Sequence, residues 1–173
     1  MGGLRTVLPL VIAGGCHFAT PEPVKDGPRA IDAASDAPGF GCPSSYVALT
    51  GQTHRYRFMA VASDWTTQKA ACTFDAPQSY LAIPDSAAEL QALDDYIANP
   101  TEYWVGISDS MFDGAYLTVK NQPQMFLPWA MGEPAPEPPP TDCVKVLTQG
   151  GLFATEVCAT SLAAVCECEP APG

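Results

Sequence analysis

The sequence is poor in basic residues, in histidine and in long apolar runs. It has 8 Lys and Arg against 19 Asp and Glu, which gives a formal net charge of −11. A nucleic-acid-binding face needs clustered basic side chains that replace phosphate counterions, so this shortage excludes nucleic acid as a partner. The chain has 2 histidines, and only His54 lies beyond residue 41. Because little is left for acid–base or metal chemistry, the sequence predicts a non-catalytic protein.

The N-terminus carries an apolar run that is too short to cross a bilayer as a helix. Arg5 is the only charge before Cys16, and it is followed by the apolar residues 7–13 and by Ala13-Gly14-Gly15-Cys16. Small residues just before a cysteine resemble the lipobox of bacterial lipoproteins, in which the cysteine thiol receives a diacylglycerol. The resemblance implies a signal peptide over 1–15, a lipid on Cys16 and export from the cytoplasm. An ordinary cleaved signal peptide is the alternative.

Residues 16–41 are expected to be the lipidated cysteine and a flexible linker. The segment is rich in proline, alanine and acidic residues and has no apolar period, so burial cannot offset its ordering entropy. As a coil it would span about 25–30 Å, which suits a tether between a membrane and a domain. An aspartate after the lipidated cysteine resembles an inner-membrane retention signal of Gram-negative bacteria. His17 stands there instead, so we expect lipid anchoring in the bacterial cell envelope, at the outer membrane.

The 7 cysteines are many for a reducing compartment, and their number is odd. Lipidation of Cys16 leaves six, which favour three disulfides in an exported domain, with fifteen possible connectivities. These six are Cys42, Cys72, Cys143, Cys158, Cys166 and Cys168. A metal site is the rival hypothesis, because Cys166-x-Cys168 is a chelating spacing. Zinc sites of the finger type combine two close pairs of ligands, and Cys166-x-Cys168 is the only such pair after residue 41. The sequence therefore favours disulfides over a metal site.

Helix and strand signals predict an α+β domain over 42–168 and a tail over 169–173. One helix should begin at 63–65, with Trp65, Ala70, Ala71 and Cys72 on its inner face. A second should span 85–99, where Ser86-x-x-Glu89 is a capping box and an apolar stripe contains Leu90, Leu93 and Ile97. Strands are expected at 46–49, 55–58, 80–83, 103–107, 116–119, 143–147, 152–155 and 163–168. The proline-rich residues 120–142 should form a long irregular loop.

Three pieces of the chain, in order, resemble the C-type lectin-like domains. The W-I-G-L core strand and turn of that family are similar to Trp104-Val105-Gly106-Ile107-Ser108-Asp109, followed by Asp113-Gly114 and Tyr116. The W-x-x-G-E-P-N … E-D-C-V stretch is similar to Trp129-x-x-Gly132-Glu133-Pro134 and then Asp142-Cys143-Val144. The closing C-x7-C-E resembles Cys158 to Glu167. The resemblance covers 42–169 and implies the family's α+β fold, with a mostly antiparallel, disulfide-stapled sheet.

The resemblance also implies how the cysteines pair. In the family pattern, Cys72 pairs with Cys166, and Cys143 pairs with Cys158. Cys42 and Cys168 remain at the two ends of the domain, and the end strands of this fold lie side by side, so a third bond between them is expected. The long form of the family closes its N-terminal hairpin with a cysteine near 55–58, which this chain lacks.

Sugar-binding members of the family hold a calcium ion in the long loop. Its five main ligand positions fall on Glu133, Ala135, Thr141, Ala154 and Thr155. Calcium takes six to eight oxygen ligands, several of them carboxylates, and only Glu133 offers one. We therefore expect neither calcium nor another cofactor. Pro134 matches the family proline, whose peptide bond is cis.

The sequence thus predicts a surface-tethered, non-catalytic recognition module that binds protein or carbohydrate through the 120–142 loop without calcium. The candidate binding residues are Trp129, Glu133, Pro134, Glu137 and Asp142. One alternative is a calcium-dependent lectin with a site rearranged around Glu133, Glu137 and Glu156. The other alternative is a structural accessory of the envelope without a small ligand.

Overall fold

The computed structural model describes residues 2–3, 41–97, 101–136, 140–147 and 150–170. The chain divides into two compact units, Met1–Asp36 and Ala37–Gly173, and nearly all described residues belong to the second. Cys16 and most of the expected signal peptide and linker lie outside the described residues, as does the candidate Glu137. Within the described residues, no helix combines the length and the apolar character that a membrane crossing requires.

The described residues of the second unit form two helices and a single sheet, which confirms the predicted α+β class. The helices are α1 (Trp65–Asp75) and α2 (Ala87–Tyr96). The strands are β1 (Val47–Ala48), β2 (Arg55–Ser63), β3 (Ser79–Leu81), β4 (Tyr103–Ser108), β5 (Leu117–Thr118), β6 (Cys143–Val146), β7 (Phe153–Glu156) and β8 (Leu162–Cys168). In the described parts of 120–142, no segment is helix or strand, as the proline content predicts.

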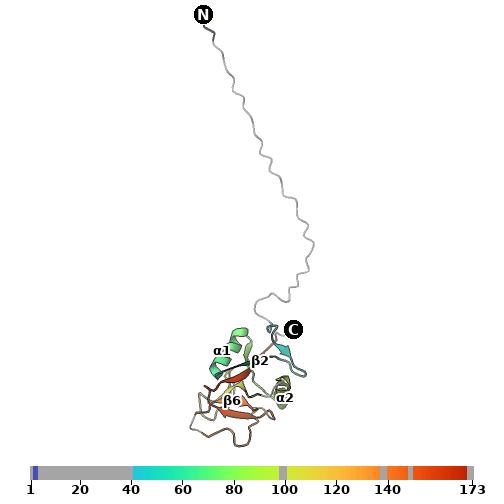
Figure 1. Ribbon diagram of the computed structural model, residues 1–173, viewed down its shortest axis with the longest axis vertical. Coiled ribbons are helices and arrows are strands. Elements are labelled where there is room, and N and C mark those ends of the chain that lie inside the picture. Colours follow the sequence, from blue (N-terminus) through green and yellow to red (C-terminus); the bar gives the residue numbers. More distant parts are fainter. Residues whose placement is uncertain (1, 4–40, 98–100, 137–139, 148–149, 171–173) are drawn as a thin grey trace. The chain divides into compact units, whose positions relative to one another are not determined.

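The sheet runs in the order β1-β2-β8-β4-β6-β7, with β3 paired to β8 and β5 paired to β4. Every pairing is antiparallel except that of β4 with β8. Figure 1 shows β2 alongside the red strand β8, in a register from Arg55 opposite Cys168 to Ser63 opposite Leu162. This long partnership explains why β2 extends five residues past the predicted end at residue 58.

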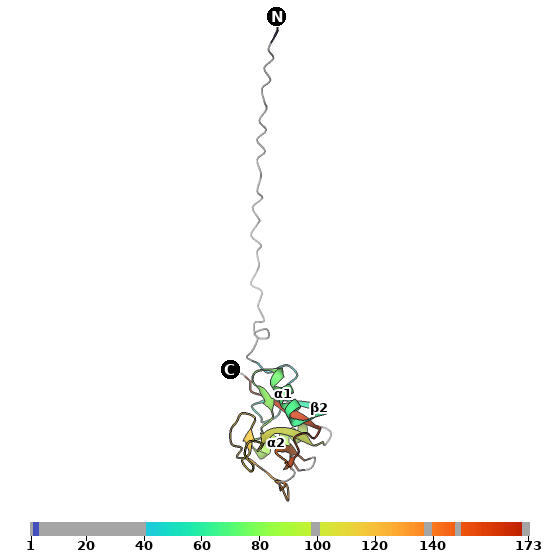
Figure 2. The same ribbon diagram turned by 90° about the vertical axis from the view of Figure 1, so that its left-hand side faces the viewer.

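The central strand β4 separates two apolar cores. Because side chains alternate along a strand, Tyr103, Val105 and Ile107 face one core, together with the α2 stripe, whereas Trp104 faces the core of α1. Figures 1 and 2 show the two helices apart, on different sides of the strands. Gly106 is required where β4 meets β3, since a Cβ there would lie 2.3 Å from the carbonyl oxygen of Leu81.

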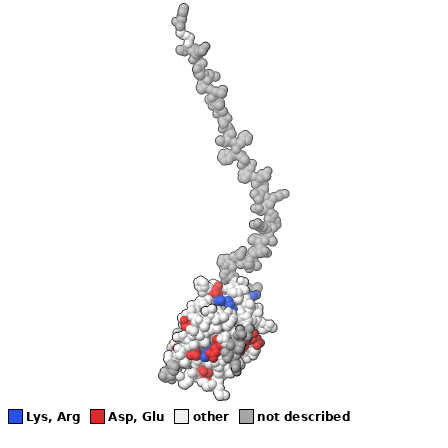
Figure 3. Space-filling view, in the orientation of Figure 1, with Lys and Arg blue, Asp and Glu red and all other residues white. Residues whose placement is uncertain are grey.

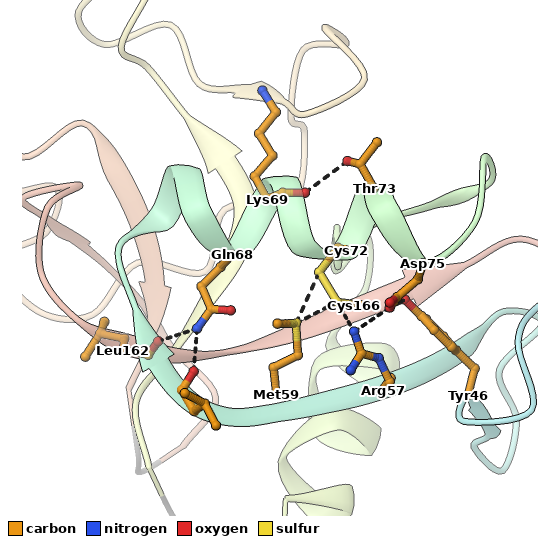
Figure 4. Close-up of a disulfide and its surroundings, with 11 residues drawn as sticks. Tyr46, Arg57, Met59, Gln68, Lys69, Cys72, Thr73, Asp75, Leu162 and Cys166 are labelled. Atoms are coloured by element: carbon orange, nitrogen blue, oxygen red, sulfur yellow. Dashed lines mark hydrogen bonds and ion pairs between the residues drawn. A yellow bond between two sulfur atoms is a disulfide. The ribbon is translucent and has the colours of Figure 1, made fainter.

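Helix α1 begins where the sequence predicts, because the Asp64 carboxylate accepts a hydrogen bond from the Thr67 amide. Its inner face differs from the prediction. Trp65 and Cys72 are buried, but Ala70 is exposed and Gln68 is buried in its place. The Gln68 amide donates to the carbonyl oxygens of Val61 and Leu162, at 2.8 and 2.9 Å, as Figure 4 shows for Leu162. Two hydrogen bonds therefore make a polar residue tolerable on this face.

Helix α2 carries the predicted stripe, with Leu90, Leu93 and Ile97 all buried. The Ser86 hydroxyl accepts from the Glu89 amide at 3.2 Å, which is half of the predicted capping box. The other half differs, because the Glu89 carboxylate accepts from the amide of Asp85 at 2.8 Å. Glu89 is also 3% exposed, so a residue predicted only to cap the helix is part of the interior.

Three disulfides staple the domain, and they are the pairs that the family resemblance implies. The Cα atoms are 5.4 Å apart in Cys72–Cys166, 5.1 Å in Cys143–Cys158 and 5.8 Å in Cys42–Cys168. Cys166 and Cys168 stand two residues apart on β8 and face the same core, yet they reach different partners. Figure 4 shows the Cys72–Cys166 bond between α1 and β8. The pairing leaves no thiol in Cys166-x-Cys168 for a metal.

Candidate functional site

The described part of the 120–142 loop is anchored on an aromatic cluster. The rings of Trp129 and Tyr116 meet edge-on with centroids 4.8 Å apart, and those of Trp129 and Phe153 are 6.2 Å apart. Phe126 packs against Phe153 from the same side, also at 6.2 Å. Trp129 also forms a bridge to β7 through the backbone opposite Phe153. The candidate binding residue Trp129 is thus half-buried and supports the loop from beneath.

Glu133 is held by the protein itself. One oxygen of its carboxylate accepts from the Thr155 hydroxyl, the Thr155 amide and the Ala135 amide, each at 2.9 Å. The Thr155 hydroxyl in turn accepts from the Ala135 amide at 2.9 Å, and Thr155 is only 6% exposed. The Glu133–Pro134 peptide is cis, as the resemblance implies, and Pro134 itself is exposed. These contacts join the loop directly to β7.

The other positions of the family's calcium site offer a poor ligand set. Ala135 and Ala154 present methyl groups, and Thr155 donates its proton to the one carboxylate present. Asp142 lies at the loop's end, where its carbonyl oxygen accepts from the Asp109 amide at 3.0 Å. The described residues at these positions therefore do not fit the six to eight oxygens that calcium requires.

Glu156, an acid of the alternative rearranged site, is engaged elsewhere. It forms an ion pair with Lys145 at 3.0 Å, and Lys145 also pairs with Glu102 at 2.9 Å. Burial opposes ionisation of Glu156, but the hydrogen bond from Lys145 prevails and lowers the pKa of this carboxyl. An ammonium group already occupies the place that a cation would take beside Glu156.

Exposed apolar side chains gather in and next to the loop. Met125 is 89% exposed and Met131 is fully exposed, at 103%. Met111 and Phe112, each 65% exposed, lie on the turn after β4. The Asp109–Asp142 hydrogen bond places this turn beside the end of the loop. Figure 3 shows acidic side chains in separate patches on one face of the domain, with basic ones in few places.

A group of ionisable residues, two of them buried carboxylates, lies elsewhere in the domain. Ligand atoms of His54, Glu89 and Glu167 lie within 4.8 Å of one another. We call these three residues the buried acid cluster. Sequence reasoning missed it, because Glu89 was assigned to a helix cap and Glu167 to the family's closing motif. His54 is engaged here with Glu167.

The sequence pattern of this chain and its fold together identify the family to which it belongs. The pattern of the lectin C-type domain matches residues 61–168, which is more than half of the chain. The chain belongs to the lectin C-type domain family. C-type lectin domains are generally non-catalytic binding modules, in agreement with the prediction from the sequence.

Known C-type lectins share this chain's sequence and fold to a moderate degree. The human C-type mannose receptor 2 is 27% identical over 124 residues, which cover 69% of this chain but only 8% of the receptor. The cow carbohydrate-recognition domain of CD23, solved in the presence of a GlcNAc2Man3 oligosaccharide, is 25% identical. It superposes with a TM-score of 0.67 and covers 77% of this chain and 99% of that chain.

The same architecture also occurs in a calcium-independent type II antifreeze protein. That structure has 20% sequence identity and a TM-score of 0.62, and the match covers 75% of this chain and 95% of that chain. At this level of identity the likeness shows the fold alone.

Proposed function

We propose that this C-type lectin domain is a non-catalytic recognition module that binds a protein ligand through the 120–142 loop without calcium. The observation that carries the proposal is the engagement of Glu133 by Thr155 and Ala135. An ion bound at this oxygen of Glu133 would have to displace these three donors. The neighbouring family positions Ala135, Ala154 and Thr155 would then offer it only methyl groups and a hydroxyl that is already engaged. The calcium-independent antifreeze protein with the same fold lends support to this proposal.

The side chains that the loop offers to a partner favour a protein over a carbohydrate. Sugars are commonly recognised by polar groups and by an exposed aromatic face, but Trp129 packs edge-on against Tyr116. Met125 and Met131 instead present flexible apolar surface, which adapts to apolar patches of a protein. Carbohydrate is the second candidate, supported by the oligosaccharide in the cow CD23 study and by the polar Asp142 at the loop's end.

We further propose that the domain is tethered to the outer membrane of a bacterial envelope by a lipid on Cys16, with residues 16–41 as the spacer. Three disulfides support export, because such bonds persist in oxidising compartments. The domain would then present its loop outside the cytoplasm. A structural accessory without any ligand at the loop is the competing hypothesis.

Calcium independence is tested by thermal unfolding. A site with a dissociation constant of about 1 mM would add about 1.4 kcal/mol at about 10 mM calcium, enough to raise Tm by several degrees. We expect calcium and magnesium at equal concentration to give the same Tm. A calcium-specific rise that Glu133→Gln abolishes would restore the calcium-dependent lectin.

The ligand class is tested with a photo-crosslinking amino acid at Met125 or Met131 in cells that produce the protein. The matched control carries it at Phe74, an apolar residue of α1 that is 92% exposed. We expect the loop positions, with or without chelator, to yield a discrete protein adduct that Phe74 does not. Identical adducts from loop and control, or none from the loop, would contradict the proposal, and binding on a glycan array would favour carbohydrate.

A further inference from the structure

Glu167 is an almost fully buried carboxylate on β8, 2% exposed. One of its oxygens accepts from the Tyr80 hydroxyl at 2.9 Å, and the other accepts from the Ile83 amide at 2.8 Å. Nδ1 of His54 lies 2.5 Å from the first oxygen and donates to it. His54 precedes β2, so this contact fastens the β1–β2 turn onto the central strand β8.

Glu89 is a second buried carboxylate, supplied by α2. Its oxygens accept from the Tyr56 hydroxyl at 2.6 Å and from the Asp85 amide at 2.8 Å. Tyr56 belongs to β2, so Glu89 fastens α2 to the same hairpin that His54 fastens to β8. Both buried carboxylates therefore contact the segment that contains β1 and β2, Glu89 through Tyr56 and Glu167 through His54.

Other charged groups surround the cluster without neutralising it. Asp85 precedes α2, and Glu169 follows β8 and accepts from the Tyr80 hydroxyl at 3.1 Å. Lys120, after β5, is paired with Glu169 and stacks over the Tyr80 ring at 3.7 Å. Arg55 follows His54 in the chain and is exposed. Acids thus predominate, and His54 is the cationic group that contacts a buried carboxylate of the cluster.

Two carboxylates this close, both removed from water, are costly to keep ionised together unless a cation or a proton accompanies them. We propose that the buried acid cluster is a proton-operated latch, in which protonated His54 and a proton on Glu89 hold the β1–β2 hairpin on β8 and α2, and which loosens when those protons leave. A surface pocket of about 380 Å³, lined by Thr53, His54, Glu169 and Pro170, connects His54 to solvent. The proton on His54 can therefore exchange without unfolding of the domain.

The titration behaviour of the two groups agrees with this geometry. The hydrogen bond to Glu167 raises the pKa of His54 above its ordinary 6.5, against an opposing effect of burial. Burial raises the pKa of Glu89 from 4.5 to about 7, against the hydrogen bonds from Tyr56 and Asp85, which favour the ionised form. A raised pKa means that the folded domain binds the proton more tightly than the unfolded chain. These protons therefore stabilise the folded domain fully at acid pH. The contribution of Glu89 to folding stability declines between pH 4.5 and about 7. The contribution of His54 declines as the pH rises from 6.5 through its raised pKa.

The latch is tested first by NMR titration of the histidines in the full chain, with EDTA present throughout. A short histidine-containing peptide serves as the reference. We expect His54 to bind its proton more tightly than the histidine of that peptide, and Glu89→Gln to reduce the difference. The control Glu156→Gln, outside the cluster, should leave it unchanged. A His54 that titrates together with the histidine of the reference peptide, or that responds equally to both substitutions, would overturn the proposal.

Amide hydrogen exchange tests whether protonation holds the hairpin. At pH 6 we expect residues 47–58 to exchange at least tenfold faster in His54→Gln than in the unsubstituted protein, and the β6–β7 hairpin to exchange equally in both. The difference should diminish as the pH rises through the raised pKa of His54, because the imidazole then loses its proton. Equal exchange at pH 6, or a difference that is undiminished at a pH where the NMR titration shows His54 to be neutral, would refute a proton-operated latch. Both tests are independent of any ligand of the loop.

Discussion

Replacing Thr155 by valine tests whether the loop is held by protein contacts where other C-type lectins hold calcium. Valine keeps the shape of threonine but removes the hydroxyl that donates to Glu133 and accepts from the Ala135 amide. A hydrogen bond to a charged group contributes about 1.5–3 kcal/mol. Because Glu133 is partly exposed and keeps its two amide donors, we expect Thr155→Val to lower the free energy of unfolding by about 1–2 kcal/mol.

The assay is urea denaturation with the disulfides intact, carried out on Thr155→Val, Glu133→Gln and the double variant. Because the two side chains are in contact, the double variant should lose about 1 kcal/mol less than the sum of the single losses. The control is Thr66→Val, at an exposed position of α1, where we expect a change within about 0.5 kcal/mol.

Two results would refute this reasoning. If Thr155→Val is no more destabilising than Thr66→Val, the Thr155 hydroxyl does not hold Glu133. If the losses of the single variants add fully, Glu133 and Thr155 do not stabilise one another. In either case Glu133 would be available to other partners, and the structural argument against calcium would fail.

Further predictions concern packing, the disulfides and the anchor. Gly106→Ala should destabilise the domain by about 1–3 kcal/mol or more, because the new methyl group would lie 2.3 Å from a backbone carbonyl oxygen. The control Gly41→Ala, with open space around it, should leave the denaturation midpoint unchanged. Replacing both Cys42 and Cys168 by serine should cost about 4–5 kcal/mol in the chain-entropy model, since the bond spans 126 residues, and a loss below about 1 kcal/mol in denaturation would contradict it. Cys16→Ser should move the protein from the membrane to the soluble fraction, and continued sedimentation with membranes would disprove the lipid anchor.

Features written in short stretches of sequence were predictable. The stripe of Leu90, Leu93 and Ile97 fixes the buried face of α2, because helical periodicity depends only on neighbours three and four residues away. Asp64 caps α1 for the same local reason. The proline content of 120–142 excludes regular structure there whatever surrounds it. The family motifs added the cysteine pairing, which spacing alone left among fifteen possibilities.

Only the tertiary structure decided which polar residues are buried and what they bind. Gln68 takes the place predicted for Ala70 on the inner face of α1, because Val61 on β2 and Leu162 on β8 offer it two carbonyl oxygens.

Glu133 accepts a hydrogen bond from Thr155, and His54 contacts Glu167, although the members of each pair are far apart in the sequence. A carboxylate looks the same in sequence whether it caps a helix, binds an ion or lies buried. Its role is set by the donors that folding brings within hydrogen-bonding distance and by the water that folding removes, and neither is a local property of the sequence.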